Sequence, residues 1–198
     1  MAEIGLFDAM YTARALRRYK PDPIPDEVIT KILDAAIRAP SGSNQQNWVF
    51  IVVKDAHKRR KIGEVYRKSA EILQSLYANR PRPPHMSEKD YQVLLNSATY
   101  LFEHLDQAPL HLFACLRDER TRFGDLGKLP QDVQSRLGAL ARATGSSIYP
   151  AVQNIILACR AFGLGTVLTT IHLFHEKELK QLLDIPEQVN TCALLPIR

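Results

Sequence analysis

The chain has 198 residues, of which 45% are hydrophobic and 24% charged, a composition typical of a globular protein large enough for one domain. The formal net charge of +5 raises nucleic acid as a partner, but the basic stretch 54–61 contains no aromatic residues. The solvated start of a helix explains that stretch as well, so we expect no nucleic acid partner. No apolar run approaches the roughly 18 residues of a membrane span, and the first residues lack the basic and apolar regions of a secretion signal. We therefore expect a cytoplasmic protein with no membrane partner.

The first predicted elements are two helices. A short helix over 6–14 runs into a basic segment and a proline-rich turn over 21–25. A second helix is predicted to begin at Pro25, with acidic residues following where the helix dipole favours them. Apolar residues at helical spacing over 28–37 form one face of this helix. A polar loop over 40–44 ends this helix.

Strands and further helices alternate along the rest of the chain. The consecutive apolar residues of 48–53 predict a strand that is buried on both faces. Beyond it we expect helices over 54–77, 87–105, 148–162 and 175–183, strands over 109–116, 166–170 and 191–197, and polar loops over 80–84 and 117–130. Gly163 and Gly165 are placed to end the apolar helix before them. Four strands among longer helices indicate an α+β or α/β layer structure.

The cysteines and histidines do not predict a catalytic or metal centre. The three cysteines lie far apart and each is inside an apolar run, which is typical of buried, reduced thiols: Cys115, Cys159 and Cys192. His172 and His175 share a helix-like spacing but have no third ligand nearby, so we expect no metal. The sequence contains no Gly-x-Gly-x-x-Gly after a strand, no Walker A loop and no Gly-x-Ser-x-Gly elbow.

Three segments offer chemistry, and each has a plainer alternative. Arg14 and Arg17, three residues apart, would lie on one side of a helical turn and could grip an anionic group, although cations also suit a helix end. The loop 40–47 combines small residues with hydroxyl and amide groups that could surround a ligand, although it also connects a helix to a strand. The threonines of 166–170 could donate hydrogen bonds, although threonine also favours strands.

Together these segments resemble the nitroreductase family of FMN-dependent, NAD(P)H-oxidising flavoenzymes. The resemblance runs from about residue 7 to 197 and rests on five motifs in chain order. The first two are Arg14-Ala-Leu-Arg17-Arg18-Tyr19 before a Pro-x-Pro turn, and Ala39-Pro40-Ser41-Gly42-Ser43-Asn44-Gln45-Gln46-Asn47-Trp48 entering a strand. The others are Tyr149-Pro150 to Gln153-Asn154, Gly163-Leu164-Gly165 to Leu168-Thr169-Thr170, and a final Ala-Leu-Leu-Pro-Ile. It implies an α+β three-layer fold in a single domain over 1–198, with a central mixed sheet of about four strands flanked by helices.

The resemblance also implies an FMN site. Arg14 would hold the phosphate or ribityl end, and Arg17 would lie near the pyrimidine side of the ring, where a cation stabilises reduced flavin. The other implied cofactor-binding residues are Ser41, Gly42, Ser43 and Asn44 in a loop packed on the flavin, and Leu168, Thr169 and Thr170 beside the isoalloxazine. The implied reaction is ping-pong hydride transfer from NADH or NADPH through FMN to a small electron-poor acceptor of nitroaromatic or quinone type. It requires no catalytic side chain from the protein.

The resemblance further implies a homodimer with the site at the subunit interface, and the apolar helix 148–162 would suit either that interface or a monomer's core. Three features depart from the family pattern. Ala13 and Ala15 flank Arg14 where many relatives have arginine and serine, Asn47 replaces a proline, and the sequence ends at Arg198 without the usual C-terminal extension and its phosphate-binding arginine. Two other functions stay open: a flavin-binding protein with weak or lost turnover, and a reductive dehalogenase or ene-reductase on the same fold.

Overall fold

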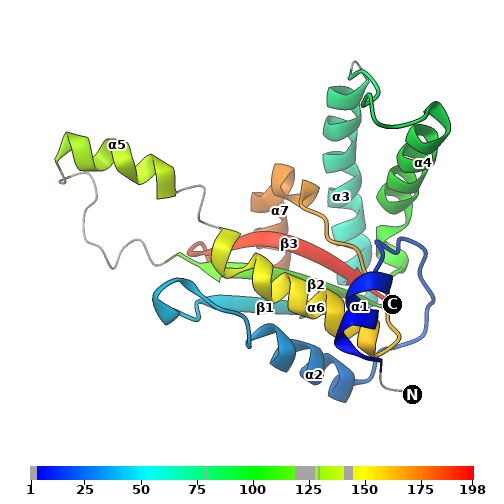
Figure 1. Ribbon diagram of the computed structural model, residues 1–198, viewed down its shortest axis with the longest axis horizontal. Helices are drawn as coiled ribbons and strands as arrows, with labels where there is room; N and C mark the ends of the chain where they lie inside the picture. The colour runs from blue at the N-terminus through cyan, green and yellow to red at the C-terminus, as the bar shows by residue number, and fades with distance from the viewer. Residues whose placement is uncertain (1–3, 79, 119–127, 129, 141–144) are drawn as a thin grey trace.

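A computed structural model of the chain describes residues 4–78, 80–118, 128, 130–140 and 145–198. A small β-sheet lies between two layers of helices (Figure 1), so the fold is α+β as the sequence indicated. Among the described residues, no helix is long and apolar enough to cross a membrane.

The sheet contains three antiparallel strands in the order β1-β2-β3. They are β1 (Trp48–Val53), β2 (Leu110–Arg117) and β3 (Val189–Ile197). At one end of the sheet Leu110 pairs with Ile197, and at the other Trp48 pairs with Leu116. The central strand β2 is buried at every residue except the last, because helices cover both of its faces.

The expected strand over 166–170 is wrong as a continuous strand, and the three strands of the sheet are antiparallel rather than mixed. This segment meets β3 only at isolated positions: Gly165 exchanges two backbone hydrogen bonds with Arg198, and Thr169 exchanges two with Leu194. Between them the ladder would need a backbone N–H from Pro196, which proline lacks. Thr166 compensates by donating its hydroxyl to the Pro196 carbonyl at 2.8 Å.

One helical layer consists of α1 (Leu6–Thr12), α2 (Asp26–Ala36) and α6 (Tyr149–Ala161). The apolar faces of α2 and α6 pack with one face of the sheet into a buried core. The predicted end of α6 is confirmed: Gly163 has φ 71°, and the following Leu164 N–H donates to the Cys159 carbonyl at 2.8 Å.

The other layer consists of α3 (Ala56–Tyr77), α4 (Glu88–His104) and α7 (Glu176–Leu183). Asp55 caps α3 by accepting from the Lys58 N–H at 2.7 Å, and Ser87 caps α4 by accepting from the Asp90 N–H at 3.1 Å. In Figure 1, α3 and α4 lie side by side and extend beyond the sheet, and α5 (Gln131–Leu140) lies to one side. Most of the predicted loop 117–130 lies outside the described residues.

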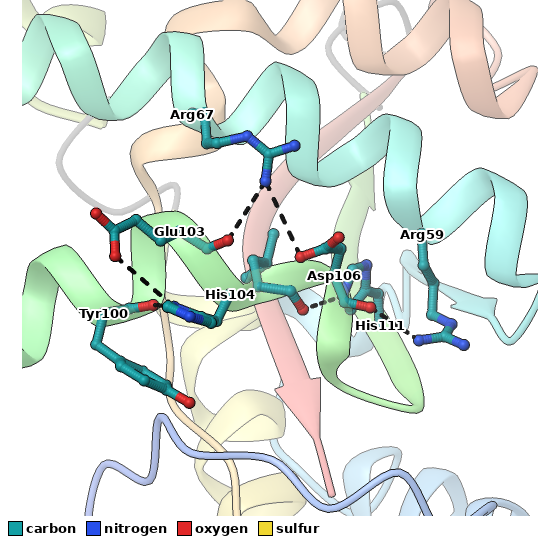
Figure 2. A network of polar contacts seen from close by, with 8 residues as sticks. Arg59, Arg67, Tyr100, Glu103, His104, Asp106 and His111 are labelled. Carbon is teal, nitrogen blue, oxygen red and sulfur yellow. Dashed lines mark hydrogen bonds and ion pairs between the residues drawn. The ribbon is translucent and has the colours of Figure 1, made fainter.

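A polar network joins α3 to the end of α4 (Figure 2). The Arg59 guanidinium donates to the carbonyls of Asp106 at 3.0 Å and Ala108 at 2.5 Å, while His111 bonds the Leu105 carbonyl at 2.9 Å. Arg59 belongs to the basic stretch that we expected to be solvated, and its burial lowers the pKa of its guanidinium. Part of that stretch is therefore structural.

The three cysteines are free thiols, as expected. Cys115 and Cys159 are buried, which raises the pKa of each to about 12, and Cys192 is half-buried. At these pKa values the two buried thiols stay protonated and are poor nucleophiles.

Candidate functional site

The segment that carries Arg14 and Arg17 is extended, which corrects the expected helical turn. Helix α1 ends at Thr12, and Ala15 forms a parallel bridge with Thr166. The Leu16 N–H donates to the Thr166 carbonyl at 3.0 Å. Pairing with a distant segment thus overrides the local helical pattern.

The two arginines differ in their surroundings as a result. Arg14 is exposed and donates to the carbonyls of Tyr11 and Ala13 at 2.9 and 2.8 Å, at the end of its own helix. Arg17 is half-buried and donates through Nη1 to the Ser97 hydroxyl of α4 at 3.1 Å. Its Nε is buried and has no partner among the described residues.

The segment 165–170 lies directly beside this arginine segment. Thr169 is buried, whereas Leu168 is exposed and Thr170 is half-buried, so the two neighbours of Thr169 face the opposite way. Both backbone groups of Thr169 bond Leu194. Strand alternation therefore directs the N–H of Thr170 away from β3. Of the three predicted residues, Leu168 and Thr170 are the accessible ones.

Gly165 allows the close approach of these segments. A Cβ at this position would lie 2.5 Å from Leu16 Cδ1, 3.1 Å from Leu16 Cβ and 3.0 Å from Arg198 Nε. With the neighbouring atoms in these positions, only glycine fits at residue 165. We call residues 14–17 together with 165–170 the arginine edge.

Two further side chains meet the arginine edge from the neighbouring helices. The hydroxyl of Tyr66, on α3, shares a hydrogen bond of 2.7 Å with the Thr169 hydroxyl, and Ser97 bonds Arg17. The sequence analysis missed both residues. Tyr66 lies in the apolar stripe of α3, four residues after the buried Ile62, where a tyrosine reads as core. The polar group at its tip was the available signal, since a buried phenol normally has a partner.

The predicted loop residues occupy a different place. Residues 41–46, which we call the serine loop, lead into β1, and Gly42, Ser43 and Asn44 are exposed. Ser43, Asn44 and Gln46 all have φ near 50°, which non-glycine residues adopt rarely. The Ser41 hydroxyl accepts the Gln46 N–H at 3.0 Å.

Ser147, just before α6, holds the serine loop to the body of the protein. Its hydroxyl accepts the Gly42 N–H at 2.9 Å, and its carbonyl accepts the indole N–H of Trp48 at 2.5 Å. The serine loop is therefore held in place by Ser147, while Gly42, Ser43 and Asn44 stay exposed.

The arginine edge and the serine loop lie on opposite edges of the sheet (Figure 1). Pairing runs from β1 to β2, to β3, to Thr166 and then to Ala15. Four steps of about 4.8 Å separate β1 from the arginine segment by roughly 19 Å across the sheet. The loop also lies at the end of the sheet where Trp48 pairs with Leu116, whereas Thr166 bridges Ile197 at the other end. The predicted site residues thus form two groups, and one chain does not bring them together.

These features define an α+β protein with a basic, hydroxyl-lined edge beside a small antiparallel sheet. Comparison with known proteins gives its family: the model of the Nitroreductase family matches residues 11–197, and the chain belongs to this family of oxidoreductases.

Individual relatives are distant but extend along the chain. An NADH dehydrogenase of Thermus thermophilus is 27% identical over 99% of this chain and 88% of its own length. An iodotyrosine deiodinase of Danio rerio is 28% identical over 96% of this chain and 58% of its own length. The crystal structure of an oxidised iodotyrosine deiodinase bound to FMN and 3-iodo-L-tyrosine superposes with a TM-score of 0.70 at 23% identity, covering 98% of this chain and 88% of that one. The last similarity shows the shared fold.

Proposed function

We propose that this protein is an FMN-dependent oxidoreductase that uses NADH or NADPH to reduce a small electron-poor compound at a site shared between two copies of the chain. The observation that carries the proposal is the arginine edge. It holds a half-buried cation, Arg17, in a segment that pairs with the one carrying the accessible Leu168 and Thr170, in a member of the nitroreductase family.

The donors of the arginine edge fit a flavin. Arg17 Nε is a buried donor without a partner among the described residues, and the N–H of Thr170 faces away from β3. An unpaired buried donor is costly, and the carbonyl oxygens and ring nitrogens of a flavin are acceptors of the right kind. Bound FMN would supply the redox chemistry, accepting hydride from NAD(P)H and returning it to the acceptor.

The protein's own residues would bind and orient the cofactor. Arg17 places a positive charge where the reduced ring becomes negative, and Arg14 can exchange its bonds to backbone carbonyls for bonds to a phosphate. Lys20 and Arg198 lie close to this segment and add to its positive charge. None of these roles needs a protein nucleophile.

A second copy of the chain would complete the site, because the serine loop lies on the far edge of its own sheet. Helix α1 provides a surface for such a contact. Its apolar side chains are exposed beside the arginine edge: Leu6, Phe7, Met10 and Tyr11. The Phe7 and Tyr11 rings stack with centroids 6.2 Å apart. An exposed apolar cluster of this size is typical of a protein interface.

The test is direct. Purified protein mixed with FMN and freed of excess should be yellow, and it should bleach without oxygen when NADH or NADPH is added. Nitroaromatics, quinones and halogenated phenols should then be compared as oxidants of the reduced protein. A protein that takes up no FMN would overturn the proposal, and one that binds FMN but never bleaches would be a flavin-binding protein without turnover.

Reductive dehalogenation is the second candidate reaction. The 28% identity to an iodotyrosine deiodinase over 96% of this chain favours it. In the acceptor comparison it predicts that halogenated phenols reoxidise the reduced protein with release of halide, faster than nitroaromatics or quinones do.

A further inference from the structure

Tyr66 connects helix α3 to the segment 165–170 across a large distance in sequence. Its side chain is 1% exposed, and its ring packs against Phe102 with centroids 6.2 Å apart. The 2.7 Å hydrogen bond to Thr169 joins residues 103 positions apart, and both side chains are buried. A buried hydroxyl pair of this kind has few alternative arrangements, because either group alone would be left without a partner.

With this bond, both the backbone and the side chain of Thr169 are hydrogen-bonded. Its N–H and carbonyl bond Leu194 at 3.0 and 2.9 Å, and its side chain bonds Tyr66. Because β3 holds the backbone of Thr169 and α3 holds its hydroxyl, the backbone orientation of the two adjacent residues is also restricted. Leu168 and Thr170 therefore face outward from a defined backbone.

Tyr66 also lies within electrostatic reach of Arg17. Burial raises the pKa of the Tyr66 phenol, while the Thr169 hydrogen bond and the Arg17 charge oppose that rise. The phenol stays neutral and protonated at physiological pH, so it keeps its donor. Tyr66 thus bonds the segment 165–170 directly and is influenced by the charge of Arg17.

We propose that Tyr66 is a positioning residue of the flavin site, whose bond to Thr169 sets the placement of Leu168 and Thr170 relative to Arg17. The inference rests on the proposed function, because it concerns the geometry of that same site. Tyr66 would not touch the flavin. It would act through Thr169, and small errors in the placement of reacting groups cost large factors in rate.

The experiment uses Tyr66→Phe and Thr169→Val, alone and together, with Tyr77→Phe on the same helix as a control. Tyr77 also belongs to α3, but it is 39% exposed and lies at the last residue of the helix, away from Thr169. For each protein we would measure the FMN Kd, the visible spectrum of bound FMN, the rate of flavin reduction by NADH or NADPH, and the melting temperature. Hydrogen exchange of the peptide spanning 165–173 in the FMN-free protein reports on the segment itself.

We expect Tyr66→Phe to change the FMN Kd by less than threefold and to slow flavin reduction at least tenfold, with a shifted flavin spectrum and faster exchange of the peptide. Thr169→Val should give the same loss, the double variant no further loss, and Tyr77→Phe none. Thr169→Ser, which keeps the hydroxyl, should retain the wild-type rate.

Several results would overturn this role. They are a Tyr66→Phe protein that reduces FMN at the wild-type rate, additive losses in the double variant, or a loss of rate matched by equal losses of FMN binding and melting temperature. A wild-type protein that takes up no FMN would instead overturn the proposed function itself. The two failures are therefore distinguishable.

Discussion

The arginine edge and the serine loop are held by different kinds of contact. The edge depends on long-range pairing, such as Leu16 with Thr166 and Thr169 with Leu194. The loop depends on bonds within itself and on Ser147, and its outer residues face solvent. One chain therefore builds a rigid half-site at one edge and presents an exposed loop at the other. In the proposed two-copy site, the edge of one copy would meet the loop of the other, and each could be disrupted separately.

The largest expected effect comes from disrupting the arginine edge in one copy of the chain and the serine loop in another. Ser43 has φ 50°, which proline cannot adopt, so Ser43→Pro should destroy the serine loop, as Arg17→Ala should disable the edge. At an FMN concentration near the wild-type Kd, neither variant alone should turn over appreciably. A mixed dimer of the two, co-expressed with different tags and purified through both, should regain one intact site. The measurement is flavin reduction per dimer.

Ser43→Gly is the control for that experiment, since glycine accepts a positive φ, and it should behave as the wild type. If the doubly purified mixed dimer is as inactive as its parents, or if the protein runs as a monomer in analytical ultracentrifugation, the two-chain site is wrong.

Next in size is Arg17→Ala by itself. Loss of a charge-assisted hydrogen bond of about 1.5–3 kcal/mol should raise the FMN Kd roughly 10- to 100-fold, read by quenching of flavin fluorescence. The control is Arg38→Ala, which removes an exposed arginine that pairs with Asp34 on α2. Equal FMN affinity in the two variants would remove Arg17 from the site.

Acid should lower the folding stability of the protein through His172, which lies two residues after Thr170. This side chain is fully buried against Phe113, and burial lowers its pKa to about 4. The unfolded histidine binds a proton near pH 6.5 and the folded one does not. Stability is therefore fully present above pH 6.5 and falls as pH decreases towards 4, by on the order of 3 kcal/mol.

Denaturant unfolding between pH 7 and pH 4 measures this slope. His172→Leu should reduce the slope by about half and not abolish it, because His111 is also fully buried with its pKa lowered to about 4. His57→Leu at the exposed start of α3 should leave the slope unchanged. An unchanged slope in His172→Leu would show that the acid sensitivity resides elsewhere.

The smallest expected effect compares one glycine from each region. Gly165→Ala would place a methyl group 2.5 Å from Leu16 Cδ1 and should cost about 1–3 kcal/mol of folding stability. At Gly42 the nearest atom would be Ser147 Oγ at 3.5 Å, an ordinary contact, so Gly42→Ala should cost less than about 0.5 kcal/mol. Thermal unfolding of both variants checks this, and equal costs would contradict the tighter packing of the arginine edge.

Much of the fold was predictable because its signals are local. Helical periodicity predicted α2 and α6, Gly163 predicted the end of α6, and consecutive apolar residues predicted β1 and β2 within one or two residues. The candidate site residues were also identifiable, through motifs that resemble one family. Their arrangement was not, since the resemblance assigned Ser41 to Asn44, Arg14 and Arg17 to one site at a subunit interface without giving the edge of the sheet on which each group lies.

The sequence by itself determined which residues carry polar chemistry and which stretches form helices, since both depend on residues that are near neighbours along the chain. Only the tertiary structure decided that the arginine segment is extended, that Pro196 keeps residues 166–170 from forming a continuous strand, and that Tyr66 bonds a threonine 103 residues away. The physical reason is the same in each case. Pairing between distant segments depends on strand order and packing, and no local pattern encodes those.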